Sequence, residues 1–150
     1  MRVYIKNQQR LIKVNQHRIK KDLRKALHLL GLHSAEISIL FVNDKRMKIL
    51  NRQYRGVDKT TDVLSFSQIE DRTLNFELRT QNILLGDIVI NLHQAKRQAA
   101  EHNLTFNEEL RFLLIHGLLH LIGYDHEKGG YARRKMQKKT LELLEELQKE

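Results

Sequence analysis

The sequence predicts an α+β fold: a single compact domain, residues 1–150, in which a small mixed β-sheet of about four strands packs with helices. Short β-branched apolar runs alternate with segments in which apolar residues recur at helical spacing. One connection between two expected strands, residues 69–83, has no sustained period and predicts an irregular excursion or a marginal hairpin. No proline-rich or glycine-rich linker divides the 150 residues, a length that can bury one proper core.

The amino-terminal part predicts two short β-like pieces and a helix. The pieces are residues 3–5 and 11–14, separated by a polar turn at residues 7–9. From about Asn15 the apolar spacing becomes helical, and Gly31 can end that helix. Four residues form its expected buried stripe: Ile19, Leu23, Leu27 and Leu30.

The middle of the chain predicts a buried strand and a second helix. Residues 37–42 are apolar and β-branched enough for a strand covered on both faces. Asn43 or Asp44 can cap the helix that follows, which is expected to run to about Tyr54. Its expected inward residues are Met47, Leu50 and Tyr54.

Two further strands and two further helices follow. A polar loop at residues 54–62 precedes a short strand at 63–67, and residues 84–90 form another strand. Asn91 can cap a helix through about Asn103.

The next helix begins with a capping box. Thr105 and Glu108 have the spacing of that motif. The last helix spans about residues 131–147, with an apolar side formed by Met136, Leu143, Leu144 and Leu147.

Three histidines around the end of the capping-box helix have the spacing of a metal site. His116 and His120 are four residues apart, so on a helix their imidazoles lie on one face. Gly123 can take the left-handed conformation that ends a helix and so brings His126 back to the same point. Three neutral nitrogens leave a fourth position open for water or substrate, as in catalytic rather than structural zinc sites.

Histidines at this spacing can also be ordinary core or surface residues. The third histidine after the glycine favours the metal, and so does the apolar segment around the pair, which would half-bury imidazoles that need partners. In the long zincin motif a glutamate follows the first histidine and acts as general base, but here the residue is Gly117. Peptide hydrolysis by that route is therefore disfavoured. The apolar residues are Leu110, Leu113, Leu114, Leu118 and Leu121.

Composition points to a polyanionic partner. Residues 1–60 hold 15 basic and 4 acidic side chains, whereas residues 61–150 hold 12 and 14. A one-sided positive charge suits nucleic acid, although a solvated basic face is the ordinary alternative. There are no cysteines, no signal-peptide pattern and no apolar run of membrane-spanning length, so we expect a cytoplasmic protein that contacts no membrane.

The chain resembles the YbeY family of metal-dependent endoribonucleases. Four segments carry the resemblance in order and spacing: residues 51–56 (NRQYRG), 61–66 (TDVLSF), 85–89 (LGDIV) and 116–126 (HGLLHLIGYDH). The resemblance implies a compact α+β fold, cleavage of single-stranded RNA, and a role at the 3′ end of 16S ribosomal RNA and in ribosome quality control. It thereby implies ribosomal RNA and the small ribosomal subunit as partners.

The same resemblance implies roles for individual residues. His116, His120 and His126 would bind one zinc ion, and Arg55 would be the functional arginine. Thr60 and Ser67 stand where family members commonly carry proline, and this chain has no proline. Prolines there would stiffen the loop, so their absence puts the rigidity of the loop holding Arg55 in doubt, not the activity.

As a hypothesis, the site cleaves a phosphodiester that Arg55 grips with its planar fork, although a loop arginine is by default a solvated charge. The proton acceptor stays unnamed. Asp125 could orient a ligand histidine, accept a proton, or just cap a turn. The neighbouring 2′-hydroxyl of RNA could also serve as the nucleophile in place of water.

The remaining candidates are weaker. Ser65 has no nucleophile signature around it, and only the resemblance draws attention to Asp62 and Asp87, which could fix loops near the metal. Two rival functions stay open: a zincin-like metallopeptidase, and a non-catalytic, zinc-stabilised, ribosome-associated RNA-binding protein. Five histidines lack mutual spacing and are taken as ordinary: His17, His28, His33, His93 and His102.

Overall fold

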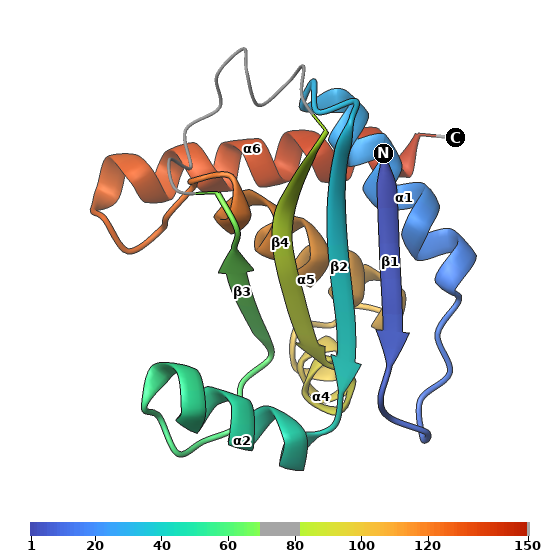
Figure 1. The fold of residues 1–150 in the computed structure, drawn as a ribbon, viewed down its shortest axis with the longest axis vertical. Coiled ribbons are helices and arrows are strands. Elements are labelled where there is room, and N and C mark those ends of the chain that lie inside the picture. Colours follow the sequence, from blue (N-terminus) through green and yellow to red (C-terminus); the bar gives the residue numbers. More distant parts are fainter. Residues whose placement is uncertain (70–81, 150) are drawn as a thin grey trace.

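A four-stranded mixed sheet forms the centre of the molecule, and its strand order is β1-β2-β4-β3. The structure, a computed structural model, describes residues 1–69 and 82–149 (Figure 1). Strands β1 (Arg2–Asn7), β2 (Ala35–Val42) and β4 (Ile83–Asn91) are parallel, and β3 (Val63–Ser67) pairs with β4 in the antiparallel sense. The predicted α+β class with a small mixed sheet is confirmed.

Helix α5 is the central helix of the layer that covers one face of the sheet. It contacts β3 and β4 as well as the helices on either side of it. Figure 1 shows the helical layer behind the sheet, with a further helix, α2, at the lower end of the strands. The helices are α1 (Gln16–Leu29), α2 (Asp44–Arg55), α4 (Leu92–Glu101), α5 (Phe106–Leu121) and α6 (Gly130–Gln148).

The helices begin where the side chains predict. Asn15, Asn43 and Asn91 each accept a backbone N–H in the first turn of α1, α2 and α4, which satisfies a donor that the helix itself leaves free. Thr105 and Glu108 form the reciprocal capping box of α5. The capping box fixes the residue at which α5 begins.

The core lies mainly between the sheet and the layer of α1, α5 and α6, and the predicted stripe of α1 is buried there. A smaller cluster under α2 covers the other face near the ends of the strands. The sequence predicted that β2 is covered on both faces along its length. In the structure, buried and half-buried residues alternate along most of β2, so only its end is fully covered on both faces. The smaller cluster comprises Val42, Met47, Leu50, Leu64 and Val89.

Two local expectations were wrong. Residues 11–14 form no strand; instead the amide of Gln9 accepts from the backbone N–H of Ile12 and donates to its carbonyl, at 2.9 and 2.7 Å, holding a loop. Tyr54 does not point inward but is 59% exposed and packs edge-to-face on Phe66. In Figure 1 the C-terminal end of α2 extends beyond the edge strand β3, and the buried residues of the helix end at Asn51. The expected excursion at 69–83 falls largely outside the described residues.

Candidate metal centre and its cleft

Two serines of β3 hold α5 at a fixed height against the sheet. The hydroxyl of Ser65 donates to the carbonyl of Gly117 at 3.3 Å, and that of Ser67 donates to the carbonyl of Leu121 at 3.1 Å. Two residues along a strand span about 6.6 Å, and four residues along a helix span about 6 Å. Side chains on one face of a strand therefore have nearly the same spacing as backbone carbonyls one turn apart on a helix. Sequence reasoning gave Ser65 no role, because this match exists only when β3 and α5 are packed together.

Gly117 allows α5 to approach β4 closely. A Cβ added there would lie 2.8 Å from Cγ2 of Ile88, which is fully buried in the middle of β4. The absence of the zincin glutamate therefore has a structural reason, since no side chain fits between this turn of the helix and the sheet. The position faces the core and not the histidine side of α5.

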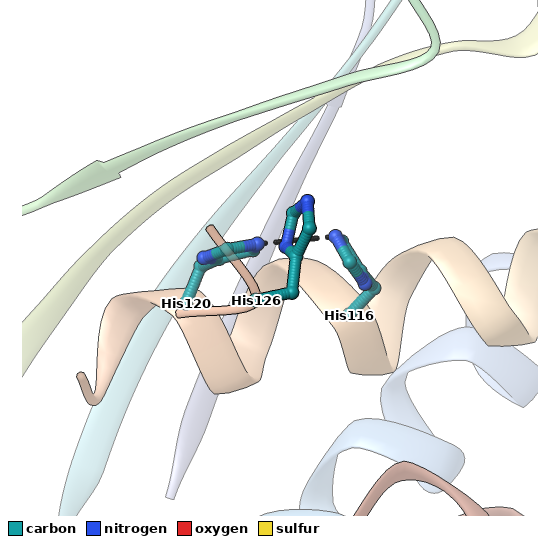
Figure 2. A group of neighbouring side chains, drawn as sticks. All are labelled: His116, His120 and His126. Atoms are coloured by element: carbon teal, nitrogen blue, oxygen red, sulfur yellow. Dashed lines mark hydrogen bonds between the residues drawn. The ribbon is translucent and has the colours of Figure 1, made fainter. Parts of the chain in front are cut away.

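The three predicted histidines converge. His116 and His120 lie one turn apart on α5, and the chain then reverses through Gly123, whose φ of 105° is in the glycine-favoured region, to bring back His126. The Nε2 atoms of His116 and His120 are 3.1 Å apart, and one ring nitrogen of each histidine lies within 4.8 Å of the others. Figure 2 shows the two helix rings turned toward each other, with His126 rising from the turn beside them.

This arrangement fits a cation. Two nitrogens about 2.0–2.1 Å from a tetrahedral zinc ion would be roughly 3.3 Å apart, close to the His116–His120 separation. Nδ1 of His126 is buried without a hydrogen-bond partner, so no protein contact at this nitrogen competes with an ion. Burial, with smaller effects from His120 and His126, lowers the pKa of His116 to about 4, so its lone pair stays available at neutral pH. Within residues 1–69 and 82–149, this histidine triad is the one cluster with ligand spacing.

A cleft of about 640 Å³ opens in front of the triad. Its walls come from β3, from α5 with the turn after it, and from the end of α2, where Arg55 is the last helical residue before Gly56 takes a left-handed φ of 69°. Arg55 is exposed and lines the cleft together with Tyr54 and Asp62. The structure thus brings the predicted arginine and the three histidines, which lie 61 or more positions apart in the sequence, to one cleft.

Side-chain hydrogen bonds fix the loop that follows Arg55, although the chain has no proline. Asn51 donates to the carbonyl of Lys59 at 2.8 Å, and Asn91 donates to the hydroxyl of Thr60 at 2.8 Å and to Asp44 at 2.7 Å. Asn91 is fully buried, so its two bonds are partly shielded from water. Thr60 therefore helps to hold the loop.

A polar network behind the cleft was not foreseen. Gln98 donates to Asp62 at 3.1 Å and to Glu109 at 3.3 Å, and Glu109, only 1% exposed, meets Nδ1 of His102 at 2.9 Å. Asp62 thus belongs to a chain of contacts that joins the cleft to α4 and α5, and His102 is not an isolated histidine. Asp87 lies within β4, in the strand that the sequence predicted, and pairs in register with Phe66 of β3.

Asp125 lines the cleft and also caps the turn that carries His126. Its Oδ1 accepts the backbone N–H of Glu127 at 2.9 Å. Of the three roles considered, the backbone-capping contact is the one the structure records, and it fixes the turn in which His126 lies.

No helix in the described parts of the chain is both long enough and apolar enough to cross a bilayer.

The comparisons with known proteins agree over nearly the whole chain. The family model described as "Endoribonuclease YbeY" matches residues 4–148. A protein of that name from Aquifex aeolicus is 40% identical, with 99% of this chain and 93% of the relative covered. One from Desulforamulus reducens is 41% identical, with 96% and 97% covered. The solution structure of a Thermotoga maritima protein matches with a TM-score of 0.67 at 28% identity, over 97% of this chain and 88% of that one. The resemblance to the YbeY family is confirmed, and the chain belongs to the YbeY endoribonuclease family.

Proposed function

We propose that this protein is a zinc-dependent endoribonuclease that cleaves single-stranded RNA, acts at the 3′ end of 16S ribosomal RNA and contributes to ribosome quality control. An RNA endonuclease role follows from family membership. The substrate, the small ribosomal subunit as partner and the cytoplasm as the place of action are the finer parts of the proposal. The observation that carries it is the buried Nδ1 of His126, which has no hydrogen-bond partner and belongs to a triad facing the cleft that Arg55 lines.

His116, His120 and His126 are the proposed ligands, and none of them has a competing carboxylate partner among the contacts described. A bound zinc ion would supply a Lewis acid for the scissile phosphate or for an attacking hydroxyl. Arg55 contributes a planar guanidinium, which can bind two phosphate oxygens at once and offset charge that grows on them. The 3.1 Å bond to Asp62 holds the end of the loop that follows Arg55, and the 2.9 Å bond to Asp125 holds the turn that carries His126.

Two rival functions are less well supported. The metallopeptidase reading needs a general base at position 117, and the contact with Ile88 leaves no room for one. The non-catalytic reading would keep the metal for stability alone. The triad lies in an open cleft of about 640 Å³, which favours a catalytic metal site over a closed structural one.

The test combines metal analysis with a cleavage assay on purified protein. His120→Ala should lose both the metal and turnover, whereas Arg55→Ala should keep the metal and lose turnover by roughly 10²–10³-fold, the usual effect of removing one charge-stabilising donor. Arg52→Ala is the matched control, because Arg52 is an exposed arginine of the same helix that does not line the cleft.

Product ends distinguish the two chemical routes. A 2′,3′-cyclic phosphate would identify the 2′-hydroxyl as the nucleophile, and direct hydrolysis products would identify water. Metal-loaded protein that is free of contaminating nucleases and leaves single-stranded RNA intact would overturn the catalytic proposal.

A further inference from the structure

A second hollow, a groove of about 600 Å³ between α5 and α6, adjoins the cleft. Phe112, His116 and His126 line both hollows, so the groove continues the cleft on the other side of the triad. Volumes of about 300–1,000 Å³ are usual for sites that take an organic group. The rest of the groove is lined by Arg133, Met136, Gln137, Thr140, Leu141 and Leu144.

Phe112 stands at the border between the two hollows. It lies one helical turn before His116, and the two rings are offset and nearly parallel, with centroids 5.8 Å apart and an interplanar angle of 30°. Phe112 is nevertheless 37% exposed. The exposed part of its ring is therefore free to stack on an aromatic partner.

Four of the side chains that line the groove are apolar: Phe112, Met136, Leu141 and Leu144. Met136 forms part of its floor at 2% exposure, and the hydroxyl of Thr140 is already bonded to the carbonyl of Met136 at 2.8 Å. Leu141, 61% exposed, forms an outer edge. Such a surface suits stacking and apolar contact rather than the reading of a base by hydrogen bonds.

Charge along α6 identifies the class of occupant. Residues 130–139 carry five basic side chains and no acidic one, whereas residues 140–148 carry three glutamates. Arg133, which lines the groove, belongs to the basic half, and this is the half that adjoins the triad through His126. An apolar slot with a cationic rim at a phosphodiester site matches a nucleotide, whose base is flat and apolar and whose phosphate is anionic.

We propose that the α5–α6 groove is a base-binding subsite, in which a nucleobase next to the scissile phosphate stacks on Phe112 while Arg133 contacts the adjoining phosphate. This inference rests on the proposed function, because it assigns the groove to the same single-stranded RNA. Every base has a flat face that can stack on an aromatic ring, so the subsite confers a preference for unpaired RNA and little preference for sequence.

The test measures the binding of short, fluorescein-labelled single-stranded RNA to the metal-loaded protein, by stopped-flow anisotropy read before cleavage. Single abasic sites are scanned along the RNA. Wild type should lose roughly tenfold in affinity at one position, the usual size of one base–aromatic stack. Phe112→Leu should bind intact RNA roughly tenfold more weakly and be insensitive to that abasic site, whereas Phe112→Tyr should behave as wild type.

Tyr131→Leu is the matched control, because Tyr131 is a 74% exposed aromatic on α6 outside the groove, and its loss should change nothing. A scan of wild type without a position-specific loss overturns the inference. So does a Phe112→Leu variant that stays equally sensitive to every abasic site, which would leave the groove to an apolar peptide. Phe112-dependent binding without cleavage would sink the proposed activity alone, and cleavage without Phe112 dependence would sink the subsite alone.

Discussion

Replacing Gly117 by alanine should destabilise the protein, although the same change in an ordinary helix is stabilising. Helix propensity alone favours alanine over glycine by about 1 kcal/mol. The added Cβ would, however, lie 2.8 Å from Cγ2, 3.2 Å from Cδ1 and 3.3 Å from Cγ1 of Ile88. Ile88 is β-branched and 0% exposed, so it cannot rotate away, and overpacking of this kind costs roughly 3 kcal/mol. The expected net loss is about 2 kcal/mol.

Urea unfolding of wild type, Gly117→Ala and Gly130→Ala measures this. Gly130 is the matched control, because its added Cβ would meet only the end of the flexible Arg134 side chain at 3.1 Å. That variant should be neutral or slightly more stable. In a double-mutant cycle, Ile88→Ala should cost less in the Gly117→Ala background than in wild type, since it removes the clash. A stabilised Gly117→Ala protein, or no coupling with Ile88, would refute the close-packing explanation for the missing glutamate.

Three further predictions concern the frame around the site. Asn91→Ala should lower the free energy of unfolding by about 2–4 kcal/mol in denaturant titrations, because it removes the cap of α4 and leaves Asp44 and Thr60 short of a donor; a loss below ~1 kcal/mol would contradict this. Ser67→Ala should cost about 0.5–1.5 kcal/mol in thermal unfolding and also weaken metal binding, since the carbonyl of Leu121 loses its partner; an unchanged metal affinity would separate β3 from the site. The pKa of His116 is lowered from 6.5 to about 4, so the unfolded metal-free chain binds the extra proton between these values and stability should fall as the pH drops through this window. Allowing for solvent screening, the fall should be about 1–2 kcal/mol in urea titrations at pH 7 and 4.5, and His116→Ala should reduce it; an equal fall in that variant would assign the effect to other groups.

Much of the fold could be predicted from the sequence, because it depends on interactions between residues that are close together in the chain. Asparagine caps, the Thr105–Glu108 capping box and the buried stripe of α1 each depend on residues within a few positions of one another, so their patterns survive in the sequence. The histidine spacing belongs to the same class, because one helical turn and one glycine bend are enough to bring three imidazoles together. Tyr54 misled for a related reason: its helical position is inward, but its helix extends past the sheet.

The sequence by itself determined the histidine triad, the helix starts and the mixed sheet, because each depends on short-range periodicity and on side chains that satisfy nearby backbone groups. Only the tertiary structure decided why position 117 must be glycine, why Ser65 and Ser67 are serines, and how Asp62 is linked through Gln98 to Glu109. These depend on contacts between segments that are far apart in the chain. The distance between two packed surfaces produces no periodic pattern in the sequence of either segment, so it cannot be predicted from the sequence.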